Sequence, residues 1–235
     1  MNMQYWSQLA DSRLNPSEKV KDEIRVSISN IRKEFPAWEQ ENDVRWAWFT
    51  GAKKVLQVAQ TSFIFTRDQL CFPDWWRSKT AEFNENHISG HIKEFFAIIL
   101  FGTSNITFTI TEELFRSLVI SIDPDACNSG RANFSSICDY TLNQLDRKQY
   151  KRIFTFHRLI RNTIHTNGVY SPPNRQNQTI EYRGKPYLFE DGKLIRFFDF
   201  ELLLALISDY NTAIYDIVMH NDIKSNDHIP RLHEL

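Results

Sequence analysis

Apolar residues recur at the spacing of an α-helix along most of the 235-residue chain, and this periodicity constrains the fold more than any other feature. Asn15 and Pro16 are typical of a helix start, because asparagine caps helices and proline suits their first turn. The pattern predicts helices over about 16–35, 42–64, 87–100, 111–122, 135–144, 147–165 and 199–220. The sequence therefore predicts a mainly α protein built as a helical bundle.

One stretch departs from this pattern. Residues 179–195 alternate between apolar and polar side chains and contain the turn dipeptide Asp191-Gly192. They predict a small β-hairpin or meander at about 178–197, inserted before the last long helix. We accordingly divide the chain into an N-terminal helical extension (1–84), a helical domain with the β insertion (85–222) and a polar tail (223–235). We expect the tail to be loosely held.

Composition is that of an ordinary soluble protein, with 42% hydrophobic and 24% charged residues. A net charge of −1 argues against broad, nonspecific coating by nucleic acid. The three cysteines form no close pair, which is typical of a reduced compartment. The first residues do not resemble a signal peptide, and the apolar runs 95–101 and 202–207 are too short to span a bilayer. We expect a cytoplasmic protein without membrane association.

The helix predicted to end near Gly168 carries the most informative residues. Since each helical residue turns by about 100°, His165, Asn162 and Arg161 fall within roughly 60° of Arg158. The opposite face is apolar and consists of Ile153, Phe156, Leu159, Ile160 and Ile164. The helix therefore buries one side and presents two guanidinium groups, a carboxamide and an imidazole on the other.

This polar face suits phosphodiester chemistry, because arginines grip phosphate and a histidine can move a proton. Asp146 is the only acidic residue between 146 and 165, where the basic residues are Arg147, Lys148, Lys151, Arg152, Arg158 and Arg161. Most charge runs are simply solvated helix faces, so the patch alone does not establish a site.

A helix ending Arg-Asn-x-x-His-x-Asn-Gly, followed by a short β insertion and a long amphipathic helix, resembles the HEPN superfamily over about residues 85–222. Its members are helical bundles, many of them metal-independent ribonucleases in toxin–antitoxin and anti-phage systems. Their motif places four to six residues between an arginine and a histidine. Six residues separate Arg158 from His165, which fits this motif, whereas only three separate Arg161, the arginine of the Arg-Asn pair, from His165. Either arginine can therefore be the functional one.

The resemblance implies an endoribonuclease with a composite site across a homodimer interface. Arg161, Asn162 and His165 would be catalytic, and Arg158, Arg161 and Lys151 would bind the RNA substrate. His165 would move protons while the ribose 2′-OH attacks, so the resemblance implies neither a cofactor nor a metal. It also implies RNA as a partner, with a cognate antitoxin or defence-system protein as a further one.

Two other functions stay open. The chain could be a catalytically inactive HEPN-like module that binds RNA, a nucleotide or a protein partner. It could also be a structural helical protein whose polar face is an interface. His87 and His91, with Glu85 and Glu94 nearby, have helical spacing for a shared metal, but two ligands without a clear third favour an ordinary surface pair.

Two further features favour packing over chemistry. Cys138 lies on a helical pattern without a catalytic signature, and we expect it to be a small core residue. Trp75 and Trp76 could form a stacking platform, but burial is the stronger expectation for so aromatic a chain.

Overall fold

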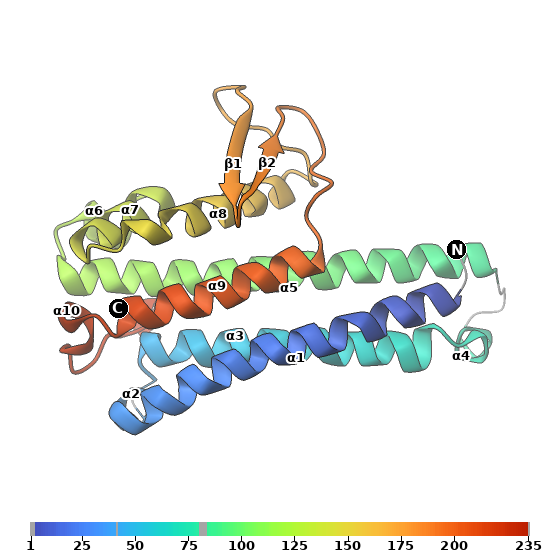
Figure 1. Cartoon of the computed structure of the whole chain (residues 1–235), viewed down its shortest axis with the longest axis horizontal. Coiled ribbons are helices and arrows are strands. Elements are labelled where there is room, and N and C mark those ends of the chain that lie inside the picture. Colours follow the sequence, from blue (N-terminus) through green and yellow to red (C-terminus); the bar gives the residue numbers. More distant parts are fainter. Residues whose placement is uncertain (1–2, 41, 80–83, 235) are drawn as a thin grey trace.

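The computed structural model describes residues 3–40, 42–79 and 84–234, and it shows a mainly α protein with one small hairpin before the last long helix (Figure 1). This confirms the predicted fold class. The elements are α1 (Met3–Glu34), α2 (Pro36–Gln40), α3 (Val44–Phe65), η1 (Thr66–Leu70), α4 (Pro73–Arg77), α5 (Glu85–Ile122), α6 (Cys127–Gly130), α7 (Phe134–Gln144), η2 (Lys148–Tyr150), α8 (Lys151–His165), β1 (Gln178–Tyr182), β2 (Lys185–Phe189), α9 (Phe200–Val218), α10 (Asn221–Lys224) and η3 (Leu232–Glu234).

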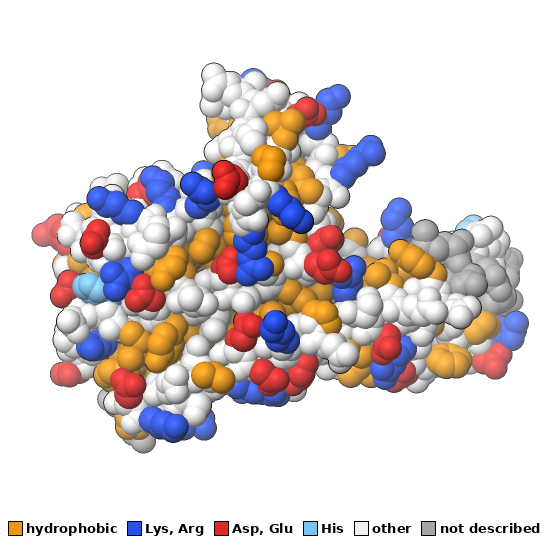
Figure 2. All heavy atoms as spheres, viewed as in Figure 1, with side chains coloured by type: hydrophobic (Ala, Val, Ile, Leu, Met, Phe, Trp, Pro, Cys, Tyr) orange, Lys and Arg blue, Asp and Glu red, His pale blue; other side chains and the backbone are white. Residues whose placement is uncertain are grey.

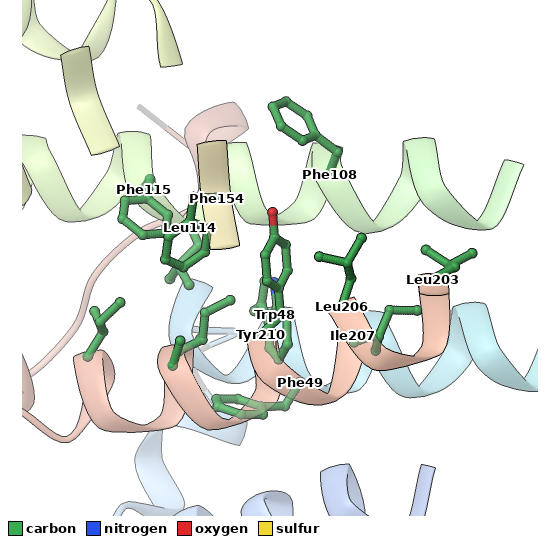
Figure 3. Packing of buried hydrophobic residues seen from close by; sticks show 14 of the residues in the cluster. Trp48, Phe49, Phe108, Leu114, Phe115, Phe154, Leu203, Leu206, Ile207 and Tyr210 are labelled. Carbon is green, nitrogen blue, oxygen red and sulfur yellow. The ribbon is translucent and has the colours of Figure 1, made fainter. Parts of the chain in front are cut away.

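The long helix α5 runs along the middle of the molecule, with α1 and α3 on one side and α7 and α8 on the other (Figure 1). Helix α9 packs against α1, α3, α5 and α8, so it closes the bundle. Figure 3 shows the core where these helices meet, with Trp48 and Phe49 from α3, Phe115 from α5 and Phe154 from α8. Tyr210 of α9 points its hydroxyl toward α5 in the same view.

Helix α5 corrects one prediction, because the segments expected at 87–100 and 111–122 belong to a single helix of 38 residues. Threonine hydroxyls in and next to the stretch between these segments bond back to the turn before. Thr107 donates to the carbonyl of Thr103 and Thr111 to that of Thr107, each at 2.8 Å. Thr111 also accepts the indole N–H of Trp48 at 2.9 Å, so polar residues in this helix join α3 to α5.

By length and composition alone, α5 also meets the criterion for a membrane-spanning helix, with a mean hydropathy of 1.3 in its most apolar window. Core helices of soluble proteins meet the same criterion, so this observation does not place the chain in a membrane. The expectation of no membrane association stays a prediction.

Helix α1 corrects a second prediction, because it begins at Met3 and continues through Pro16 instead of starting there. Proline cannot donate to the carbonyl of Ser12, and packing offsets this loss. Trp6 and Ala10, on the turns before Pro16, are buried, and the indole N–H of Trp6 donates to Ser89 of α5 at 2.8 Å. Each of the two buried clusters of hydrophobic residues thus contains residues from both sides of the boundary predicted at residue 85.

The C-terminal tail is docked, so the expectation that it is loosely held is wrong. Ile223 and Ile229 are buried, and the backbone N–H of Ile229 donates to Asp43 at 2.7 Å. The guanidinium of Arg45 donates to the carbonyls of Ile223 and Asn226 at 2.7 and 3.0 Å. A charged pair buried under α10 therefore holds a segment whose own sequence is mostly polar.

The hairpin stands off the helical body (Figures 1 and 2). Strands β1 and β2 are antiparallel, with Gln178 opposite Phe189, and the turn falls at Arg183-Gly184, where both φ angles are positive. The Asp191-Gly192 dipeptide, by contrast, turns the chain after β2. Phe156 of α8 packs on Tyr182 and on two other hairpin aromatics, which fixes the hairpin to the helix that carries the predicted site.

Charges of both signs are interspersed over the face seen in Figure 2. Many are paired, and the pairs include several of the basic residues between 146 and 165. Arg147 pairs with Asp216 at 2.6 Å, and Lys151 pairs with Asp139 at 2.8 Å. Only part of the predicted basic patch is therefore available to an anion.

Candidate functional site

Helix α8 has the two faces that the sequence predicts. Phe154, Phe156 and Ile160 are buried, whereas Asn162 and His165 are exposed. Arg158 and Arg161 are half-buried between these extremes. The amphipathic sequence thus directs four polar side chains away from the core over the last two turns of the helix.

The end of α8 is fixed by its backbone. Asn167 adopts a left-handed conformation with φ of 56°, and Gly168 follows with φ of 83°. The N–H of Gly168 donates to the carbonyl of Thr163 at 2.9 Å, and that of Asn167 to Ile164 at 3.1 Å, which is a Schellman motif. His165 is therefore the last helical residue, and the chain turns away immediately beyond it.

His165 is exposed and forms no hydrogen bond or ion pair with the part of the chain that the structure describes. It lies one turn beyond Arg161, a spacing that places Cβ atoms about 5–6 Å apart. Its imidazole is thus accessible to a ligand that also reaches the arginine.

The two arginines differ from most others in the chain, which pair with carboxylates. Among the described residues, Arg158 and Arg161 are the half-buried arginines that form no ion pair with a carboxylate. The Nε atom of Arg158 is buried and has no hydrogen-bond partner in the described part of the chain. Arg161 lies over the ring of Phe108, 5.2 Å from its centroid, and donates to Asn162 at 3.3 Å. Both guanidinium groups keep donors available for an anion.

Two pockets flank these residues, and Arg158 and Asn162 line both. A pocket of about 320 Å³ lies against α5 and includes Arg161, Arg116 and Glu112. Glu112 is engaged by Arg116 at 2.5 Å, so cations outnumber anions there. The second pocket, of about 550 Å³, lies against the loop between α8 and β1. The arginines thus stand between two hollows in the surface.

Lys151 lies apart from the other predicted site residues. It is the first residue of α8, pairs with Asp139 and lines a different pocket, beside β1. Arg158 lies seven residues further on, or about 10 Å along a helix. The structure therefore brings Arg158, Arg161 and Asn162 together at one pocket. His165 lies one turn further along α8 and lines neither pocket, and Lys151 lies apart from all of them.

Sequence reasoning missed His157, which is fully buried between α5 and α9. Its Nε2 lies 3.0 Å from the Ser104 hydroxyl and its Nδ1 lies 2.9 Å from the Tyr210 hydroxyl. Burial lowers the pKa of His157 to about 3, so the ring is neutral, with one nitrogen donating and the other accepting. The signal in the sequence was the position of His157 on a helical wheel, where it lies at the edge of the apolar face that becomes buried.

The other candidates take structural positions. His87 and His91 are exposed on the first turns of α5, and His91 stacks on Trp76 with centroids 6.0 Å apart. Within the described residues, no three His, Cys, Asp or Glu side chains are grouped to hold a metal. Cys138 is buried, as predicted, and burial raises the pKa of its thiol. Trp75 and Trp76 are half-buried against the second core cluster, around Trp6.

Comparisons of the chain with protein-family models, curated proteins and solved structures find no match. A functional conclusion must therefore come from the chemistry of the site itself.

Proposed function

We propose that the protein is a metal-independent endoribonuclease of the HEPN type. One observation carries this proposal: two half-buried guanidinium groups share a helix face with an exposed histidine, and none of the three has an acidic partner among the described residues. Arginine without an acidic partner suits a phosphate, and histidine beside it suits proton transfer to or from the same group. RNA is the substrate class, because its 2′-OH supplies an internal nucleophile.

In the proposed reaction the 2′-oxygen attacks phosphorus, and the bond from phosphorus to the 5′-oxygen breaks. A base takes the 2′-OH proton and an acid gives a proton to the departing 5′-oxygen. The products are a 2′,3′-cyclic phosphate and a 5′-OH end. Acid–base groups of this kind each contribute about 10²–10⁴ in rate. His165 takes one of these roles.

Arg158 and Arg161 stabilise the charge that develops on the phosphoryl oxygens. Asn162 accepts a hydrogen bond from Arg161, which makes it an orienting group for that guanidinium. The pocket against α5 holds the phosphate, since Arg158, Arg161 and Asn162 all line it. Both arginines thus act on phosphate, and the motif spacing does not force a choice between them.

A homodimer supplies the second acid–base group. Each chain places one His165 on its polar face, and the reaction needs both a base and an acid. A two-fold contact that includes the end of α8 would bring the two imidazoles to one phosphate. The same proposal places the protein in the cytoplasm, as part of a toxin–antitoxin or anti-phage module. It includes a cognate inhibitor as a partner.

The test is cleavage of a single-stranded RNA in the presence of chelator by the wild type, His165→Ala and His87→Ala. We expect the wild type to cleave and leave 2′,3′-cyclic phosphate ends. His165→Ala should lose at least about 10²-fold in rate. His87→Ala is the matched control, because His87 is also exposed on a helix but lies outside the site.

Light scattering at micromolar concentration tests the dimer. A folded His165→Ala variant that cleaves at the wild-type rate would refute the catalytic role, and a persistent monomer would refute the composite site. RNA binding without cleavage by the wild type would identify an inactive HEPN-like module instead.

A further inference from the structure

The larger pocket beside Arg158 has an unusual lining. Arg158 is the charged side chain in it, and no aspartate or glutamate among the described residues lines it. Its other polar groups are mostly carboxamides, including Asn162, Gln176, Asn177 and Gln178. Its volume, about 550 Å³, lies in the range of small-molecule sites. The pocket is therefore built for a neutral or anionic polar ligand.

Hydrogen bonds fix which way these carboxamides face. Asn162 accepts from a guanidinium of Arg161, and Asn177 accepts from the backbone N–H of Asp191 at 2.9 Å. Both partners can only donate, so each bond engages the carboxamide oxygen and leaves the NH₂ group without a partner among the described residues.

The carboxamide oxygens of Gln176 and Gln178 are also hydrogen-bonded. Gln176 accepts from the NH₂ group of Asn174, and Gln178 accepts from the Tyr170 hydroxyl, each at 3.3 Å. Four carboxamides thus have their oxygens occupied, and the hydrogen-bonding capacity that remains around the pocket consists mainly of N–H donors.

We infer that this pocket is a nucleobase subsite that selects uracil or guanine in the RNA strand bound at Arg158. These bases present carbonyl oxygens to donors, namely O4 of uracil and O6 with N7 of guanine. Cytosine and adenine would instead place an amino group against these N–H donors, and two donors cannot form a hydrogen bond with each other. Leu159 and the rings of Pro172 and Pro173 supply apolar surface for the faces of the base.

The inference rests on the proposed function only in taking a ribonucleotide as the ligand. Arg158 joins the two sites, since it lines this pocket and the phosphate pocket against α5. A base in one pocket and its phosphate in the other would both lie beside that guanidinium. The strand must be unpaired, because a base inside a duplex cannot enter a pocket in the protein.

Calorimetric binding of the four nucleoside 3′-monophosphates to the wild-type protein tests the inference without any cleavage. We expect the uridine and guanosine compounds to bind about tenfold more tightly than those of cytidine and adenosine. Inorganic phosphate is the fifth probe, and it should bind more weakly than the preferred nucleotides. Because all four nucleotides carry the same phosphate, their ratio of affinities reports on the base alone.

Two variants replace a single NH₂ group by an oxygen. Asn177→Asp and Gln178→Glu keep the hydrogen bonds accepted from Asp191 and Tyr170, but turn a donor into an acceptor. Each should reduce or reverse the preference for uridine and guanosine. Gln57→Glu makes the same change on the exposed face of α3 and should leave the preference intact. Thermal melts confirm that each variant is folded.

Equal affinity for the four nucleotides, a preference that both pocket variants leave unchanged, or phosphate binding as tight as nucleotide binding would overturn the subsite. A base preference that responds to the variants, in a protein that cleaves no RNA, would support the subsite and refute the ribonuclease proposal. Cleavage by a protein with no base preference would refute the subsite alone.

Discussion

Arg45 and Arg158 show two uses of a guanidinium in one chain. Arg45 is fully buried and saturated: it pairs with Asp43 through two oxygens, stacks on Trp38 at 3.8 Å and donates to carbonyls of the C-terminal tail. Arg158 is half-buried beside two pockets, forms no ion pair within the described chain and has a buried Nε without a partner.

The difference teaches how to separate structural from functional polar groups. A buried donor left unpaired costs free energy, so a group that only stabilises the fold is surrounded by acceptors. The N–H donors of Arg45 are hydrogen-bonded inside the protein, whereas those of Arg158 remain available to a ligand. The same contrast separates His157, buried and hydrogen-bonded at both nitrogens, from His165, which is exposed at the end of the same helix.

The largest expected effect is on the saturated site. Arg45→Met should lower the free energy of unfolding by about 3–5 kcal/mol, because it leaves the buried Asp43 carboxylate without the guanidinium that pairs with it. Urea denaturation measures the loss. Arg32→Met removes an exposed pair with Glu39 and should cost no more than about 1 kcal/mol. Equal losses in the two variants would show that the buried pair of Arg45 stabilises the fold no more than an exposed pair does.

The next effect concerns the unsaturated site. Arg158→Ala and Arg161→Ala should each weaken binding of single-stranded RNA by about 1.5–3 kcal/mol, the value of a charge-assisted hydrogen bond. Fluorescence anisotropy at fixed salt measures the affinity. Arg152→Ala lies on the same helix but faces Glu181, and it should change affinity little. If all three variants bind alike, the patch acts only through its general charge.

A third prediction uses pH to probe the buried His157, which is hydrogen-bonded to Ser104 and Tyr210. The pKa of this residue is about 3 in the folded protein against 6.5 for an ordinary histidine, so the unfolded chain binds more protons between these values. Above pH 6.5 this histidine therefore does not lower the free energy of unfolding. Below pH 6.5 it lowers that free energy by about 1.4 kcal/mol for each pH unit. His157→Gln should show a shallower loss between pH 7 and 5. Parallel curves for the two proteins would contradict this.

The smallest effect sharpens the comparison. Arg158→Ala should change the free energy of unfolding by no more than about 0.5 kcal/mol, because no ion pair in the described chain is broken. The same urea series measures it. A loss approaching that of Arg45→Met would show that Arg158 belongs to the fold, and its place in the proposed site would have to be given up.

The sequence predicted the helical class, the hairpin before the last helix and the polar face of α8, because each rests on a local period or on turn chemistry. It failed where tertiary packing overrode a local signal. The predicted pattern has helix boundaries at Pro16 and at residues 101–110, yet both lie within long helices that also carry residues buried or bonded across the bundle. The polar tail is likewise held by Arg45, nearly 180 residues earlier in the chain.

By itself the sequence determined which side chains share the outer face of α8, since a helix fixes their directions within one turn. Only the tertiary structure decided which of them are free to act. Lys151 pairs with Asp139, whereas Arg158 and Arg161 lie beside the pockets and pair with no carboxylate of the described residues. The loop carboxamides around the larger pocket are the clearest case, because their orientation depends on partners such as Asp191, which only folding brings near.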